Sequence, residues 1–145
     1  MADTVTDAFR QDIADRVLGL PVAAALGLSF VELADGRARS RLPWRAELSH
    51  APAAFQANPI AALADFTGVS AGLTLFPPGT AAATADYTAK FLAEARGEEL
   101  TARARVLRAG ALTVSAVDVV TVAGDEERLC ATVLVTARVF GRPAS

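Results

Sequence analysis

The sequence is poor in the residues that build disulfide and metal sites, with one cysteine and one histidine among 145 residues. A single cysteine, Cys130, excludes an intrachain disulfide and is ordinary for a reducing cytosol. Since the only histidine is His50 and no ligand spacing occurs, we expect no metal site. There is neither a glycine-rich phosphate loop nor a Gly-x-Ser-x-Gly segment, so nucleotide binding and serine-hydrolase chemistry have no support.

An excess of charge of one sign is also missing. The 14 basic and 16 acidic residues give a net charge of −2, so we expect neither nucleic acid nor an anionic membrane as a partner. The N-terminal segment is polar and acidic and lacks the features of a signal peptide. The longest apolar stretch, after Pro59, is interrupted by Asp65 and ends at Pro77, which is too short to span a bilayer. We therefore expect a cytoplasmic protein.

What the chain does have is apolar residues, which make up 52% of it, against 21% charged residues. That balance and the length predict one globular domain over residues 1–145. Helical spacing of apolar residues predicts an N-terminal helix within 1–20, followed by a short helical turn at 21–27. A longer helix is predicted over 59–76, with Asn58 as its cap and Pro59 in its first turn.

In the rest of the chain, apolar and polar residues alternate as they do in β-strands. Asp35-Gly36 lies between two alternating runs and predicts a hairpin, while residues 45–57 are expected to form a loop. Four strand-like runs follow the long helix, at 80–95, 99–110, 111–124 and 128–140. The expected fold is α+β, with about six antiparallel strands and one long helix. Because that helix is apolar nearly all round, either the sheet wraps it or a second copy covers its far side.

The order and spacing of these segments resemble a known family. The strings ALGLSFVELADGRARSRLP, IAALADFTGVSAG, TADYTAKFLAEARGEELTARARVLRAG and VSAVDV, between Leu26 and Phe140, are similar to acyl-CoA thioesterases of the phenylacetate-degradation (PaaI-like) type. That resemblance implies the hot-dog fold, in which a curled antiparallel sheet wraps a central helix. It also implies a homo-oligomer, a dimer or a dimer of dimers, with the active site shared between subunits.

The central residue is Asp65, an aspartate in the middle of an apolar helix that offers it no partner. An unpaired carboxylate in such a setting is costly, so it serves either a structural partner elsewhere or chemistry. The resemblance favours chemistry, with Asp65 as general base or as direct nucleophile. The residues on the same helix face as Asp65 are mostly small, so a facing helix or a ligand could approach closely at Gly68.

The family commonly opens its helix with His-Gly-Gly, where this chain has Gln56-Ala57-Asn58. The resemblance implies that the backbone N–H of Ala57 stabilises the oxyanion, with Asn58 as the other possible donor. Gln56 could bond the acyl group or only stabilise the loop. His50 falls where the family often has an asparagine and could contact the thioester, or be a plain surface residue.

Thr84 matches a serine or threonine that helps to hold the water in the family, and is otherwise an ordinary strand threonine. A further departure is Gly110-Ala111, where the family has Gly-Arg. Four arginines could meet the phosphates of coenzyme A or simply be solvated: Arg96, Arg103, Arg105 and Arg108.

Three functions remain open from the sequence. The leading hypothesis is an acyl-CoA thioesterase that hydrolyses a thioester to a carboxylic acid and a free thiol without a cofactor. The first alternative is a non-catalytic hot-dog protein that binds an acyl thioester or acts as an assembly module, which the loss of His-Gly-Gly favours. The last is a dehydratase acting on acyl thioesters, a chemistry that usually needs a histidine paired with a carboxylate.

Overall fold

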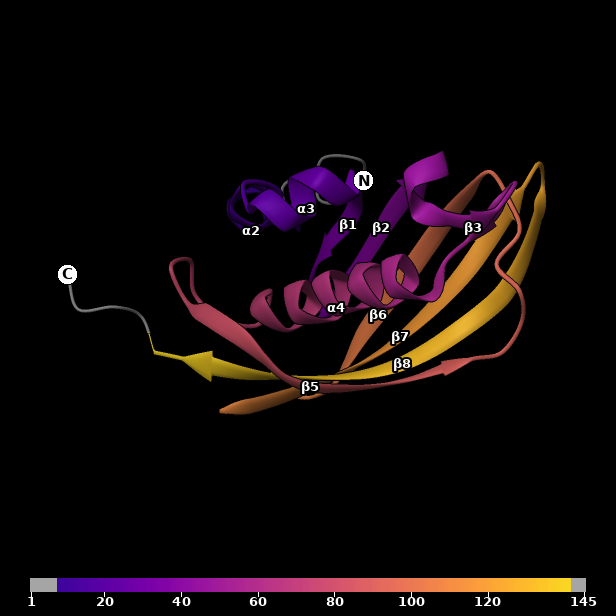
Figure 1. The fold of residues 1–145 in the computed structure, drawn as a ribbon. Coiled ribbons are helices and arrows are strands. Elements are labelled where there is room, and N and C mark those ends of the chain that lie inside the picture. Colours follow the sequence, from indigo (N-terminus) through magenta and orange to yellow (C-terminus); the bar gives the residue numbers. More distant parts are fainter. Residues whose placement is uncertain (1–7, 142–145) are drawn as a thin grey trace.

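The computed structural model describes residues 8–141, which form one curved sheet with a long helix against it (Figure 1). The helices are α2 (Gln11–Leu18), α3 (Pro21–Leu26) and α4 (Ala57–Leu73), with a short 3₁₀ turn, η1, at Ala46–Leu48. The strands are β1 (Ser29–Ala34), β2 (Arg37–Pro43), β3 (Ser49–Ala51), β4 (Ala54–Phe55), β5 (Ala81–Phe91), β6 (Glu99–Arg108), β7 (Leu112–Ala123) and β8 (Glu126–Phe140).

The sheet is antiparallel throughout and has six strands in the order β1-β2-β6-β7-β8-β5. The expected hairpin joins β1 and β2, and Asp35 and Gly36 have φ of 55° and 76°. Two positive φ values in a two-residue loop define the type I′ turn, whose twist matches that of the strands. The predicted α+β class, with six strands and one long helix, is confirmed.

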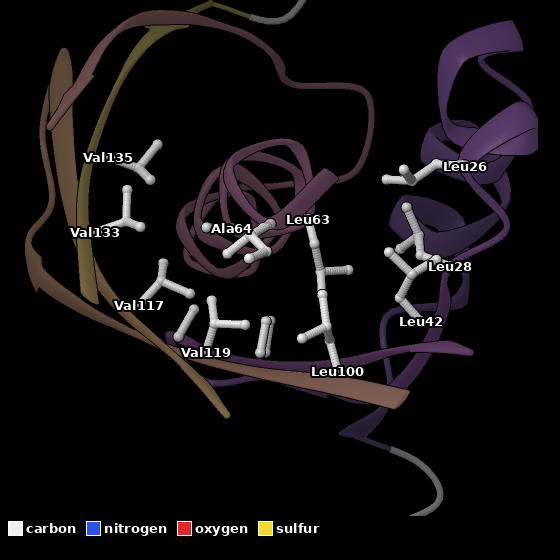
Figure 2. Packing of buried hydrophobic residues seen from close by; sticks show 14 of the residues in the cluster. Leu26, Leu28, Leu42, Leu63, Ala64, Leu100, Val117, Val119, Val133 and Val135 are labelled. Carbon is white, nitrogen blue, oxygen red and sulfur yellow. The ribbon is translucent and has the colours of Figure 1, made fainter. Parts of the chain in front are cut away.

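The core lies between the concave face of the sheet and α4. Figure 2 looks along the helix and shows the labelled valines of β7 and β8 pointing at it from the sheet, with Leu26 and Leu28 on the opposite side. Leu63 and Ala64 of α4 are fully buried in this cluster. The helix is therefore enclosed by the sheet on one side and partly by the N-terminal segments on the other, which accounts for its apolar character nearly all round.

The structure corrects the bounds of the helices. Residues 1–7 of the expected N-terminal helix lie outside the described part of the chain, and Phe9 and Arg10 are not helical. The backbone N–H of Arg10 instead donates to Leu33 O on β1 at 2.8 Å, and its guanidinium donates to Thr74 O and Phe76 O. The short turn predicted at 21–27 is confirmed as α3.

The long helix begins two residues earlier than expected and ends three residues earlier. The Gln56 side chain caps it by accepting from the N–H of Asn58, so Asn58 lies inside the helix and is not its cap. At the other end, Leu75 N and Phe76 N bond to carbonyls three residues back, which tightens the chain into a turn. The loop expected over 45–57 contains η1 and the small hairpin of β3 and β4.

No helix among residues 8–141 is long and apolar enough to cross a membrane.

Candidate active site

Asp65 lies near the middle of α4 and reaches the edge strand β5. The hydroxyl of Thr84 donates a hydrogen bond to Asp65 Oδ1 at 2.7 Å. These two residues are 19 positions apart in the chain, and the structure brings them into direct contact. Thr84 itself is exposed, because β5 is the last strand of the sheet and has a neighbour on one side only.

The surroundings of Asp65 shift its acidity. Burial in an apolar setting raises the pKa of the Asp65 carboxyl, and the hydrogen bond from Thr84 offsets this in part by lowering it. None of the ion pairs among the described residues involves Asp65, so no cation counters the effect of burial. A half-buried carboxylate with a raised pKa and one hydrogen bond has an oxygen left to accept a proton from a bound water.

An apolar groove opens beside Asp65. Its volume is about 240 Å³, and it runs between α2, α4 and β5. The lining residues are Arg16, Val17 and Leu20 of α2 and the residues after it, Asp65, Phe66, Val69, Ser70 and Leu73 of α4, and Ala82 and Thr84 of β5. A carboxylate at the rim of an apolar groove suits a substrate with a reactive polar centre and an apolar tail.

The second candidate feature is the N-terminus of α4. The N–H of Asn58 donates to Gln56 Oε1 at 2.6 Å, and Pro59 has no N–H. The N–H of Ala57 donates to no other group within residues 8–141, and Ala57 is exposed. Of the two backbone donors expected from the sequence, Asn58 is therefore occupied and Ala57 is free to bind an oxyanion.

These two features are well separated within one copy. Ala57 and Asp65 are eight residues apart on one helix, which corresponds to about 12 Å along the axis. A catalytic base and an oxyanion donor must both lie within hydrogen-bond distance of the reacting group. This separation favours a site that takes the two groups from different copies of the chain.

Comparison with known proteins gives the family. A model of the thioesterase superfamily matches residues 59–131, half of the chain, from the start of α4 into β8. The chain belongs to the thioesterase superfamily. No curated protein matches it in sequence.

Solved structures agree with this family. A thioesterase family protein from Silicibacter pomeroyi is 27% identical with a TM-score of 0.84, covering 90% of this chain and 96% of that one. A conserved protein from Pseudomonas aeruginosa is 25% identical with a TM-score of 0.77, covering 88% and 99%. The PaaI protein from the phenylacetic acid degradation operon of E. coli is 21% identical with a TM-score of 0.75, covering 91% and 93%, and shows the fold. The PaaI-like hot-dog fold expected from the sequence is confirmed, and membership of this superfamily supports thioester hydrolysis in general terms.

The other predicted site residues lie near the helix start. His50 is on β3, in the hairpin that leads into α4, and its Nε2 lies 3.8 Å from Glu94 Oε1 with both side chains about half exposed. Arg96 also binds Glu94, at 2.9 Å. His50 does not line the groove at Asp65 in the same copy. Gln56 has the structural task of capping the helix, which was one of its two expected roles.

The sequence also predicts a substrate contact at Gly68. Gly68 faces the sheet and not the groove, since a Cβ there would lie 3.0 Å from Val135 and 3.1 Å from Val117. Its carbonyl accepts from Ser115 Oγ at 2.9 Å. Within one copy, the small residue at 68 therefore lets α4 pack closely on β7 and β8.

The four arginines do not form one cluster. Arg103 and Arg105 alternate on β6 with the buried Ala102 and Ala104, so they lie on the face of the sheet opposite α4. Arg103 is bound to Glu127 at 2.7 Å. Arg96 lies at the small hairpin, on a different part of the surface. Within the described residues of one copy, these arginines therefore do not form a common phosphate-binding cluster beside Asp65.

Sequence reasoning missed the groove itself. Its walls include α2, and no motif predicts which face of α4 an N-terminal helix will cover. Ser70 is the one residue that could have indicated the groove from the sequence, because a serine in the most apolar helix of the chain needs a hydrogen-bond partner.

Proposed function

We propose that the protein hydrolyses acyl-CoA thioesters, with Asp65 as the residue that activates water. The observation that carries this proposal is the Asp65 carboxylate, which is held by Thr84 and has no cation partner among the described residues, at the rim of an apolar groove. The family supports the general reaction, and the raised pKa of Asp65 suits a general base.

The proposed reaction begins with a water bound to the free oxygen of Asp65. The water oxygen attacks the thioester carbonyl carbon as Asp65 removes its proton. The carbonyl oxygen becomes an oxyanion, which accepts a hydrogen bond from the free N–H of Ala57 at the helix N-terminus. The C–S bond then breaks, the electron pair leaves with sulfur, and the thiolate takes a proton. Attack by Asp65 itself, through an anhydride, is the second form of this mechanism.

The shared site requires a homo-oligomer, at least a dimer. Support comes from β5, which is eleven residues long and exposed on both faces over residues 83–88, with one edge free of any described strand. The opposite edge of the sheet differs, since Arg10 bonds to β1 there. A long, unprotected edge strand is a template for pairing with another strand, and a second copy supplies one of the same length.

The alternative is a non-catalytic protein that binds acyl thioesters. The helix start favours it, because Gln56 occupies the N–H of Asn58 and leaves a single backbone donor there. A dehydratase has less support, because His50 is exposed and lies outside the groove.

A thiol-release screen of the pure protein against aliphatic and aromatic acyl-CoAs tests the activity. We expect hydrolysis of at least one substrate class by the parent protein and loss of that hydrolysis in Asp65→Asn. A folded parent protein that binds these thioesters and releases no thiol would support the binding alternative and overturn the proposal.

Mixing two inactive variants tests the shared site. In a symmetric dimer, a heterodimer of Ala57→Pro and Asp65→Asn contains one intact site and one doubly altered site, so random exchange should restore about a quarter of the parental activity. Each variant alone serves as the control. A mixture that exchanges subunits and stays inactive would mean that both groups act within one copy or that the donor lies elsewhere.

A further inference from the structure

Ser70 has a buried hydroxyl without a partner. The residue is 0% exposed, and its Oγ is one of three buried side-chain polar atoms in the described part of the chain that make no hydrogen bond. The neighbouring Thr67, also in α4, donates to Leu63 O at 2.6 Å and contacts Ser40 Oγ at 2.6 Å. An unpaired buried hydroxyl is costly, so a partner that binds from outside the chain would stabilise this part of the helix.

The position of Ser70 supplies a reason. It lines the same groove as Asp65 and lies five residues further along α4, which places the two Cα atoms about 9 Å apart in an α-helix. At about 100° per residue, Ser70 is turned well away from Asp65 around the helix, so the two residues mark opposite sides of the groove. The surface between them is apolar, formed chiefly by Phe66, Val69 and Leu73.

The groove is large enough for a short acyl group. Its volume of about 240 Å³ exceeds the roughly 150 Å³ that suffices for a benzene ring in an engineered cavity. A chain with its thioester carbon at Asp65 would pass over the apolar surface and end beside Ser70.

We infer that Ser70 determines specificity by hydrogen-bonding a neutral oxygen, a hydroxyl or an oxo group, at the far end of a short acyl chain bound in this groove. The inference rests on the proposed function. A serine hydroxyl can both donate to and accept from such a group. An ionised end group fits less well, because a full charge next to a fully buried serine loses its hydration. A site built to bond a hydroxyl discriminates against the analogue that lacks it, since the protein group is then left unpaired.

The test compares ω-hydroxyhexanoyl-CoA with heptanoyl-CoA, which has a methyl group in place of the hydroxyl. The parent protein should prefer the hydroxylated thioester by up to about tenfold in kcat/KM, the range expected of one net hydrogen bond. Ser70→Ala should lose this preference. Ser115→Ala removes another buried serine hydroxyl, on β7 and outside the groove, and should keep it.

Several outcomes would overturn the inference. A parent protein that hydrolyses both thioesters without preference would mean that Ser70 holds only water, and this result needs no variant. Equal ratios for the parent and folded Ser70→Ala would mean the same. If neither thioester is hydrolysed, the thiol-release screen against other acyl-CoAs decides the proposed function separately, and calorimetry with non-hydrolysable ketone analogues of the two compounds still tests the preference as binding affinity.

Discussion

On the side of α4 that faces the sheet, Gly68 and Gly72 leave no room for a methyl group, and the buried hydroxyl of Thr67 is paired with Ser40. On the side that faces the groove, Asp65 has a single hydrogen-bond partner within residues 8–141 and Ser70 has none there. The polar side chains of α4 thus have their hydrogen-bond partners on the side facing the sheet and lack some of them on the side facing the groove. Because unpaired polar groups reduce stability, their position on one side only indicates a function that requires them.

The largest effect that separates the two sides should come from Asp65→Asn. The variant keeps the size of the side chain and removes the base, so we expect thioester hydrolysis to fall by about 100-fold or more. Thiol release under saturating substrate measures this. A stable variant with undiminished turnover would remove Asp65 from the mechanism.

The same variant should not lose stability. Burial raises the pKa of Asp65, so the folded state binds its proton more tightly than the unfolded state does. The stabilising contribution of the protonated carboxyl is present below the ordinary pKa and is lost as pH rises through the raised one. At neutral pH the ionised group is a cost, and Asp65→Asn should leave the melting temperature level or raise it. A structural Asp65 would give the reverse, with easy unfolding of the variant.

A loss of similar size is expected at the N-terminus of α4. Ala57→Pro removes the one free backbone donor there, and loss of an oxyanion donor typically costs about 100- to 1,000-fold in turnover. Ala57→Gly keeps the N–H and serves as the matched control, with activity near that of the parent. Retained turnover in a folded proline variant would show that the oxyanion binds elsewhere.

Substitutions on the side of α4 that faces the sheet should lower the stability of the protein and leave the turnover of each folded molecule unchanged. Gly68→Ala places a Cβ 3.0 Å from Val135, and overpacking of this kind costs about 1–3 kcal/mol, which exceeds the helix-propensity gain of about 1 kcal/mol. Urea unfolding measures the loss. Gly110→Ala is the control, because a Cβ there meets nothing closer than 3.8 Å and should change stability by less than about 0.5 kcal/mol. Equal stability of Gly68→Ala and the parent would contradict the close packing.

The sequence predicts more of the sheet-facing side than of the groove. Alternation along β6 from Ala102 to Arg105 and the Asp35-Gly36 turn depend on local rules, and both predictions are confirmed. The sequence predicts the start of α4 two residues too late, because Gln56 caps the helix through its side chain, a role that Asn fills more often by residue type.

The candidate site depends on contacts between distant segments. The resemblance to the family predicts Asp65 and Thr84 as separate site residues and does not predict their contact. The pairing of β5 with β8 at the edge of the sheet is what brings Thr84 to α4. The sequence does not decide what lies against Gly68, because a row of small residues along a helix has the same pattern whether a sheet or a ligand packs on it. The position of α2 over α4 settles which side is the groove, and helical periodicity alone does not contain that information.

The smallest predicted effect concerns the hydrogen bond between Thr84 and Asp65 at the rim of the groove. Thr84→Val keeps the shape of the side chain and removes the hydroxyl that donates to Asp65 Oδ1. That hydrogen bond favours the ionised form and lowers the pKa of Asp65, while burial raises it. Without it the pKa rises further, so the base is protonated up to a higher pH. The acid limb of the profile of kcat/KM against pH should therefore move to higher pH, with a modest loss of activity well above the pKa. Thr88→Val, on the same strand and beyond contact with Asp65, should leave the profile unchanged. A shift to lower pH in Thr84→Val, or none, would mean that Thr84 does not stabilise the ionised carboxylate during turnover.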